Sequence, residues 1–421
     1  MGVDAVSVRA VDDARLAPGI VRPLHEGYTF AALPATIQRL LTGAGADPGL
    51  PAPALAGLPE RAEQVVLVLL DAFGWCFFER HAEHHPLLRR LIDHGAVAKL
   101  TSQFPSTTTA HITTLHSGVG VAEHGLYEWN GYEPSIDELI TPLLFSFAGD
   151  GARDTLRCSG ADPRVLYPTR TVYRRLTEQG VACSAFQPAA FSPSTYDGVM
   201  LDGAQVRPYA TLREGLADAA RVLHARPGPA YAYVYVDTVD AAGHERGPKS
   251  AFFDAIVRHC LDAIEGALLS FPPGTLVLLG ADHGQVDVDP ARTIFVNERW
   301  PQIERHLRRG ASGRPLAPAG SPRDLFLHVV PGSVEEVVTR LEEVVGDLAS
   351  VHPVRDLLAQ GLFGADPGPR LRARVGDVCV LPARGETVWW RERGRFDMRF
   401  LGHHGGLSPE EAETVVAGLV T

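Results

Sequence analysis

Three continuous apolar runs divide the chain, and each ends in or next to an acidic residue. The runs are VVLVLLDA (65–72), YAYVYVDTVD (231–240) and TLVLLGADHG (275–284), and a fourth segment, AVAKLTSQF (96–104), also has strand character. Apolar runs of this length are typical of parallel strands that are covered on both faces. We therefore predict four buried strands that belong to one sheet.

Helical patterns lie between these runs. Residues 249–270 repeat apolar positions with amphipathic periodicity, and STTTAHITTLHSG (106–118) begins with residues that cap helices and ends in glycine. Alternating strands and helices predict an α/β fold with a mainly parallel sheet flanked by helices on both faces. Ligands of such sheets collect at the carboxyl ends of the strands. Three acidic residues follow predicted strand ends: Asp71, Asp240 and Asp282.

Composition along the chain predicts three parts. Residues 1–62 are rich in Ala, Pro and Gly, and we expect an N-terminal arm and connector that packs on the core. Residues 63–294 and 399–421 form the predicted catalytic α/β core. Residues 295–398 contain DLFLHVV, SVEEVVTRLEEVV and RVGDVCVLPA, which predict a small α+β insertion that could act as a lid.

Charge and composition narrow the class of protein. The 421 residues carry a formal net charge of -11, which argues against binding a nucleic-acid duplex through a basic surface. Small anionic substrates remain compatible, because bound divalent cations can dominate the local field. We expect no membrane span and no secretory signal, since no long apolar stretch is present. Five scattered cysteines predict reduced thiols in a cytoplasmic protein.

Four short segments supply side chains that bind metals. LLDAFG, VDAAGH, GADHG and LGHHGG together contain Asp71, Asp240, His244, Asp282, His283, His403 and His404. Carboxylates combined with imidazoles suit zinc, with manganese or iron as competitors. A lone Asp at a strand end is commonly a cap, and a lone His is commonly a core group. Four such segments, three of them at predicted strand ends, favour a metal centre instead.

A run of three threonines lies where a strand is followed by a helix. The first turn of a helix offers free N–H groups and a positive dipole end, which favour phosphate. A hydroxyl held there beside a divalent cation can ionise and attack phosphorus. Alone, Thr107, Thr108 and Thr109 could equally be caps of the helix.

In order and content these segments resemble the alkaline phosphatase superfamily, in particular its type I phosphodiesterase and nucleotide pyrophosphatase branch. The resemblance covers about residues 62–294 and 398–412. FPSTTTAHITTLHSG resembles the nucleophile segment of that branch, which implies Thr108 as the nucleophile. VDAAGHERGP resembles its Asp-x-x-Gly-His-x-x-Gly-Pro element, and GADHG its Asp-His-Gly element. GHHGG resembles its Gly-x-His-Gly element, which selects His404 over His403.

The resemblance implies an alkaline phosphatase-like fold with two divalent metal ions, Zn²⁺ first and Mn²⁺ second. One metal would take Asp71, Thr108, Asp282 and His283, and the other Asp240, His244 and His404. VAEHGLYEWN resembles the segment that carries an Asn donor to a phosphate oxygen, which implies Asn130. Further candidates for substrate contact are Phe73, His111, Tyr127 and Trp129, which could equally be packing residues of the core or of the cavity wall.

The function that the resemblance implies is hydrolysis of phosphodiester or pyrophosphate bonds through a covalent threonyl-phosphate intermediate. The substrate would be a small anionic phosphoester, with a nucleotide as one candidate. The nucleophile segment lacks an Arg, which favours diesters, because a second substituent leaves less charge on phosphorus. A phosphomonoesterase or phosphonate hydrolase on the same scaffold is the alternative, and a metal-containing binding protein without turnover is another. The oligomeric state stays open.

Overall fold

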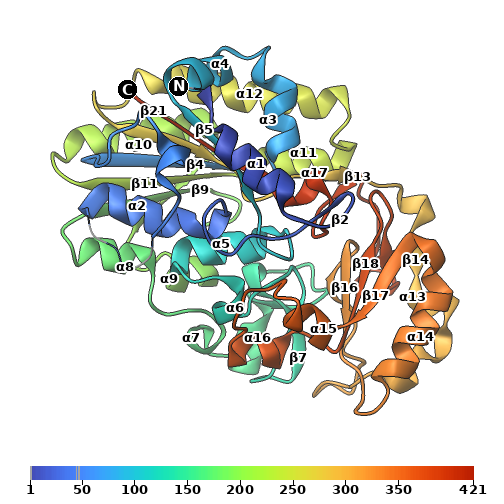
Figure 1. Ribbon diagram of the computed structural model, residues 1–421. Helices are drawn as coiled ribbons and strands as arrows, with labels where there is room; N and C mark the ends of the chain where they lie inside the picture. The colour runs from blue at the N-terminus through green and yellow to red at the C-terminus, as the bar shows by residue number, and fades with distance from the viewer. Residues whose placement is uncertain (1, 44, 46–47) are drawn as a thin grey trace.

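A mainly parallel sheet of eight strands runs through the protein (Figure 1). The structure is a computed structural model that describes residues 2–43, 45 and 48–421. In spatial order the strands are β1 (Gly2–Val3), β5 (Ala96–Thr101), β21 (Glu413–Val420), β12 (Leu276–Gly280), β4 (Gln64–Leu70), β11 (Ala230–Val236), β9 (Ala182–Pro188) and β10 (Gln205–Tyr209). All neighbours pair in parallel except β21, which runs antiparallel to both β5 and β12.

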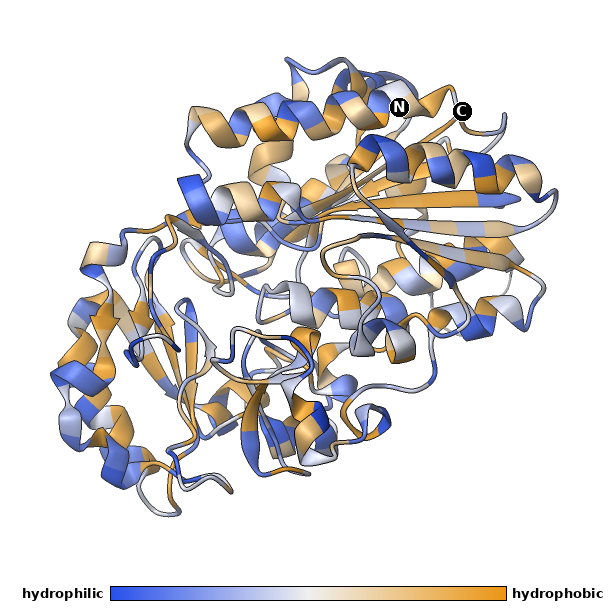
Figure 2. Cartoon of the chain, turned by 180° about the vertical axis from the view of Figure 1, so that it is seen from behind, coloured by the Kyte–Doolittle hydropathy of each residue, from blue (hydrophilic) through white to orange (hydrophobic). Residues whose placement is uncertain are grey.

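Helices cover both faces of this sheet, as predicted. One face packs against α2 (Leu33–Thr42), α5 (Thr108–Ser117), α8 (Val172–Thr177) and α9 (Thr195–Met200). The other face packs against α3 (Trp75–Ala82), α4 (Pro86–His94), α10 (Leu212–Ala225) and α12 (Ala251–Leu268). Side chains of β4 alternate between the two cores, with Leu67 on one side and Val68 on the other. Figure 2 shows the resulting apolar strands between the helical layers.

The four predicted strands are present, and each lies within or next to its predicted run. They are β4, β5, β11 and β12, and the predicted helices at 106–118 and 249–270 correspond to α5 and α12. The sequence analysis assigned no strand to residues 413–420, which form β21 between β5 and β12. Every residue of β21 except the last is buried or nearly so, because both of its edges are paired.

The N-terminal segment packs on the edge of the core. β1 extends the sheet beside β5, and α1 (Ala5–Asp13) follows it. The Nζ of Lys99 on β5 lies 2.6 Å from Asp12 and 2.7 Å from Glu413, which joins this segment to β21. These contacts are compatible with the predicted arm, although the division into three parts remains a prediction.

Residues 295–398 contain a second, antiparallel sheet. Its order is β15 (Ala319–Ser321), β16 (Asp324–Leu327), β18 (Val378–Pro382) and β17 (Ala349–Pro353). The helix α14 (Val334–Val345) packs on it, and the whole unit lies at one end of the main sheet (Figure 1). The three elements predicted from DLFLHVV, SVEEVVTRLEEVV and RVGDVCVLPA are β16, α14 and β18.

Shorter elements connect these units. They include α6 (Val121–His124), β6 (Gly131–Glu133), β7 (Glu138–Thr141), α11 (Thr238–Arg246), β13 (Val286–Asp287), β14 (Ile294–Phe295), α13 (Val296–Arg299), α15 (Val354–Ala359), α16 (Pro369–Arg374), β19 (Val388–Trp389), β20 (Gly402–His403) and α17 (Pro409–Ala412). Within the described residues, no helix combines the length and apolar character needed to cross a bilayer.

Candidate active site

The first group of candidate ligands lies at the carboxyl ends of two neighbouring strands. Asp71 follows β4, and Asp282 and His283 follow β12, which pairs in parallel with β4. The Nε2 of His283 lies 3.5 Å from Oδ1 of Asp71 and 3.4 Å from Oδ2 of Asp282. All three side chains are buried, and their ligand atoms lie within 4.8 Å of one another. We call Asp71, Asp282 and His283 the first ligand set.

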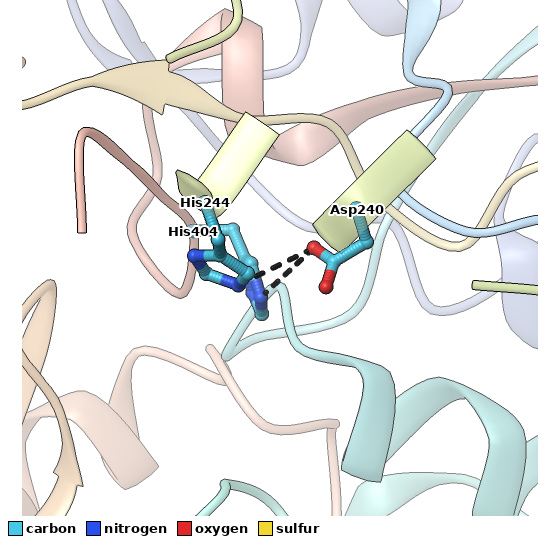
Figure 3. Close-up of side chains that lie close together, drawn as sticks. All are labelled: Asp240, His244 and His404. Atoms are coloured by element: carbon cyan, nitrogen blue, oxygen red, sulfur yellow. Dashed lines mark ion pairs between the residues drawn. The ribbon is translucent and has the colours of Figure 1, made fainter. Parts of the chain in front are cut away.

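The second group combines one helix with a late loop. Asp240 and His244 lie one turn apart on α11, and His404 directly follows β20. Oδ1 of Asp240 lies 3.4 Å from Nε2 of His244 and 3.6 Å from Nε2 of His404. Figure 3 shows both imidazoles directed at this carboxylate. We call Asp240, His244 and His404 the second ligand set; the neighbouring His403 is not part of it.

Hydrogen bonds define which ring nitrogen of each ligand histidine is free. The Nδ1 atoms of His283, His244 and His404 each lie at hydrogen-bond distance from a backbone carbonyl, so each neutral ring donates from Nδ1. The carbonyls belong to Gly284, Gly402 and Ser106, at 3.0, 2.8 and 3.1 Å. Each Nε2 therefore directs a lone pair toward carboxylate oxygens. Acceptors that converge in this way repel one another unless a cation lies between them.

Burial favours the neutral forms of the His283 and His404 rings and disfavours the charged form of Asp71. It lowers the pKa of His283 to about 4 and that of His404 well below its ordinary value. Burial, followed by the charges of Asp282 and Asp240, raises the pKa of Asp71 well above its ordinary value. Oδ2 of Asp282 is buried, and no hydrogen-bond partner is recorded for it among the described residues. Divalent cations fit this donor set, because they would balance the carboxylates and accept the free lone pairs.

Thr108 is the first residue of α5 and faces the first ligand set. Thr107 is the N-cap of this helix, and its side chain accepts a hydrogen bond from the N–H of Ala110. Oγ1 of Thr108 lies 3.1 Å from Nε2 of His283 and 3.4 Å from Oδ2 of Asp71. A hydroxyl at a helix N-terminus, in contact with a candidate ligand set, is placed to attack a bound phosphoryl group.

Two polar residues that the sequence analysis missed hold the carboxylates. The hydroxyl of Tyr235 donates to Oδ2 of Asp71, and the amide of Gln285 donates to Oδ1 of Asp240. Gln285 directly follows the GADHG segment, which was a usable signal. Tyr235 is one of three tyrosines in the apolar run of β11, and only the pairing of β11 with β4 brings it to Asp71.

A glycine in VDAAGH makes room for one of these contacts. A Cβ atom at Gly243 would lie 2.0 Å from Oε1 of Gln285, which is much too close. The backbone of Gly243 also lies close to Gly402 on β20. A Cβ atom at Gly402 would lie 2.4 Å from the carbonyl oxygen of Gly243. The two glycines therefore let α11 approach the segments that carry Gln285 and His404.

Asn130 lies next to Trp129 in the lining of the site. The hydroxyl of Thr141 donates to Oδ1 of Asn130 at 2.9 Å, which orients the amide group. The carbonyl oxygen of Asn130 accepts from the N–H of Gly320 at 2.7 Å, so β15 of the second sheet also holds this segment. Asn130 lines the same cavity as Thr108. Its side-chain N–H groups can therefore donate to a ligand there.

Of the four further candidates for substrate contact, only Trp129 lies in the site. It is 45% exposed and lines the cavities. Phe73 and Tyr127 are buried in the apolar cores. His111 is also fully buried: its Nε2 accepts from the N–H of Gln103 and its Nδ1 donates to the carbonyl of Thr107, both at 2.7 Å. The burial of Phe73, Tyr127 and His111 fits the alternative, in which these side chains pack in the core.

Two cavities meet at Thr108. The larger has a volume of about 470 Å³ and includes the second ligand set. The smaller, of about 210 Å³, includes Asp71 and the apolar side chains of Ile112, Leu143, Leu144 and Phe191. Thr108, Trp129 and Asp240 line both. A phosphoryl group at this junction could extend one substituent into each cavity.

A third group of metal-binding side chains lies elsewhere and is internally satisfied. His85, Asp262 and Glu265 come together between α4 and α12. Nδ1 of His85 accepts from the N–H of Leu87 at 3.2 Å, so its Nε2 carries the proton and donates to Asp262 at 3.1 Å. Since no lone pair of His85 remains free, this group is not a candidate metal site.

The fold and the site together define a hydrolase that acts on phosphoric ester bonds. The chain belongs to the type I phosphodiesterase / nucleotide pyrophosphatase family, whose model matches residues 65–407. Among solved structures, murine ectonucleotide pyrophosphatase/phosphodiesterase 5 in an inactive form with AMP is similar, with 14% identity and a TM-score of 0.65. That match covers 84% of this chain and 87% of the murine chain.

The human protein of the same name matches at 14% identity, with a TM-score of 0.62 and the same shares of both chains. These similarities establish the fold. No curated protein sequence matches the chain.

Proposed function

We propose that the chain is a two-metal phosphodiesterase or nucleotide pyrophosphatase in which Thr108 attacks phosphorus. The placement of Oγ1 of Thr108 carries this proposal. This oxygen lies at the start of α5, contacts His283 and Asp71 of the first ligand set, and borders both cavities. Membership of the phosphodiesterase family supports the same reaction class.

The two ligand sets would each hold one divalent cation, with Zn²⁺ the first choice and Mn²⁺ the second. Thr108 would complete the first set. When bound, the cations would supply Lewis acidity that lowers the pKa of a hydroxyl and neutralises charge on the phosphoryl group. The lone pairs of the three ligand histidines, free of hydrogen bonds to the backbone, support this occupancy.

The residues of the chain perform the remaining steps. The amide of Asn130 and the N–H groups of the first turn of α5 would hold the non-bridging oxygens of the phosphoryl group. Oγ1 of Thr108 loses its proton to solvent and bonds to phosphorus, while the bond from phosphorus to the leaving oxygen breaks and that oxygen takes up a proton. Water then bonds to phosphorus, the bond to Oγ1 breaks, and Thr108 regains a proton.

Two cavities at one nucleophile favour a diester or pyrophosphate over a monoester. A monoester has one substituent and would leave one cavity unfilled, whereas a diester fills both. A nucleotide fits this arrangement, since the related murine structure contains AMP and Trp129 offers an exposed aromatic face between the cavities. A phosphomonoesterase or phosphonate hydrolase, and a binding protein without turnover, are the alternatives that the following experiment separates.

Thr108→Ala tests the proposal directly. Hydrolysis of bis-p-nitrophenyl phosphate and of p-nitrophenyl phosphate is measured for the unmodified protein and the variant, with bound metal quantified in both. We expect the diester to be the better substrate and the variant to lose at least about 10³-fold in kcat. Thr113→Ala, on the same helix but hydrogen-bonded to Tyr196 instead, serves as the control. Near-normal turnover by the metal-loaded Thr108→Ala variant excludes the proposed nucleophile.

We further propose that the protein acts in the cytoplasm and that residues 295–398 serve as a lid over the site. All five cysteines lie unpaired, which suits a reducing compartment. Gly320, Ser321 and Trp389 of this segment line the larger cavity, which supports a role in covering the substrate.

A further inference from the structure

One wall of the larger cavity has no role in the reaction proposed above. This wall consists of Trp389 and the segment 394–400, and it faces the second ligand set. The ring of Phe400 at the end of the segment lies 4.7 Å from that of His244, measured between centroids. A group that leaves phosphorus toward the second ligand set therefore enters a space bordered by this segment.

Most charged side chains along the wall already have partners. Arg395 donates to Glu392 and to the carbonyl of Ala148, both at 2.8 Å. Asp397 accepts from the N–H of Gly394 at 3.1 Å. These contacts hold the turn of the segment together, so both side chains are committed to its structure.

Arg399 is different. It lines the cavity and is exposed, and no ion pair or hydrogen bond is recorded for it anywhere in the described part of the chain. Its guanidinium carbon lies 5.9 Å from the ring centroid of Phe400, the residue that packs on His244. An unpaired cation thus lines the cavity that contains the second ligand set.

Two acidic residues outside the wall, Glu128 and Asp240, line the same cavity, and neither forms an ion pair with Arg399 in the described part of the chain. Glu128 is buried, and burial raises the pKa of its carboxyl to about 7. Its carboxylate accepts from the N–H of Trp129. Asp240 is a member of the second ligand set, and its charge would be balanced there. Among the described residues, Arg399 is therefore the arginine of the wall that has no carboxylate partner.

The direction of attack assigns the two cavities to the two substituents. Thr108 attacks from the side of the first ligand set, and in-line displacement sends the leaving group to the opposite side of phosphorus. The larger cavity contains the second ligand set and Arg399, and we assign the leaving group to it. The smaller cavity, whose lining mixes apolar side chains with polar ones such as Arg153 and Asp197, would keep the substituent that stays on phosphorus.

We propose that Arg399 selects substrates whose leaving group carries its own negative charge, as phosphate or pyrophosphate does. The guanidinium would pair with the oxygens of that group and not with the phosphoryl group under attack. This proposal rests on the proposed function, because it assumes attack by Thr108. It concerns specificity, and it makes Arg399 a residue that recognises the leaving group.

Two substrates that share the retained part and differ in the leaving group provide the test. One is a nucleoside triphosphate, which releases pyrophosphate, and the other is the p-nitrophenyl ester of the same nucleoside monophosphate. For Arg399→Ala we expect kcat/KM to fall about 10- to 100-fold with the triphosphate and to change less than about threefold with the ester. Arg399→Lys should restore part of the loss. Arg393→Ala, directly before the segment and outside the cavity lining, should change neither value.

Each other outcome overturns a defined statement. Equal losses with both substrates, or no loss with either, exclude charge recognition by Arg399. If the unmodified protein cleaves the ester but not the triphosphate, recognition of a charged leaving group by Arg399 is also excluded. The proposed phosphodiesterase function is then still supported. Cleavage of neither substrate by the metal-loaded protein overturns the proposed function itself. Raising the salt concentration should lower kcat/KM for the triphosphate more in the unmodified protein than in Arg399→Ala.

Discussion

The imidazole rings of His283 and His404 stack with centroids 3.9 Å apart and an angle of 21° between their planes. Each ring belongs to a different ligand set, so the stack joins the loop after β12 to the loop after β20. Both rings are neutral, because burial lowers the pKa of each. Two neutral rings can stack closely where two imidazolium rings would repel. The two ligand sets consequently form one continuous centre.

Removal of divalent cations should abolish phosphodiester hydrolysis and lower the thermal stability. Without cations, the carboxylates of Asp71 and Asp282 and the Nε2 lone pair of His283 converge in a buried space, where they repel one another and destabilise the folded state. Cations that bind only the folded state at 100 to 1,000 times their Kd add about 3 to 4 kcal/mol of stability. Activity, metal content and Tm are measured before chelation, after chelation and after return of Zn²⁺ or Mn²⁺. Full activity in protein without detectable metal would contradict a metal centre.

Tyr235→Phe should weaken binding at the first ligand set while the fold is kept. The variant loses only the hydroxyl that donates to Asp71. Loss of an outer partner of a metal ligand typically lowers metal affinity or activity about 10- to 100-fold. Competition with a chromogenic chelator measures the affinity. Tyr231→Phe is the control, because Tyr231 lies on the same strand and has no recorded contact to either ligand set among the described residues; it should retain normal metal affinity. Similar losses of affinity in both variants would mean that a change in packing, and not the lost hydrogen bond to Asp71, weakens metal binding.

Gly243→Ala should destabilise the protein and impair the second ligand set. The new Cβ atom would lie 2.0 Å from Oε1 of Gln285, so that Gln285 must move away from Asp240. Overpacking of this kind costs about 1 to 3 kcal/mol. Gly266→Ala on α12 is the matched helical control, because its nearest neighbour would be 3.8 Å away and alanine favours helices. Chemical denaturation measures the free energy of unfolding of both variants and of the unmodified protein. If Gly243→Ala has the same free energy of unfolding as the unmodified protein, Gln285 tolerates the added Cβ atom and the prediction is wrong.

The unmodified protein should lose stability relative to His116→Gln as the pH falls below about 6.5. Burial lowers the pKa of His116 to about 3, from an ordinary value of 6.5. Between these values the unfolded chain binds a proton at this residue and the folded chain does not, so acid favours unfolding. The relative loss should reach about 2 kcal/mol at pH 5. Urea denaturation of both proteins from pH 8 to pH 5 measures it, and a difference that stays constant with pH would contradict the shifted pKa.

Local patterns predicted the parts of the fold that depend on neighbouring residues. The apolar run of β4 and the caps of α5 are properties of short segments, and both elements appear where they were expected. The strand β21 was not predicted, because its place depends on pairing with β5 and β12, which come far earlier in the chain. Its own eight residues, ETVVAGLV, contain no signal for those partners.

By itself, the sequence determined the short motifs that contain Asp, His and Thr. These motifs were enough to identify the candidate metal ligands and Thr108. Only the tertiary structure decided which side chains share a cavity. It buried His111, Phe73 and Tyr127, and it brought Tyr235 to Asp71. The physical reason is that the direction and burial of a side chain depend on packing between segments distant in the sequence, which no local pattern encodes.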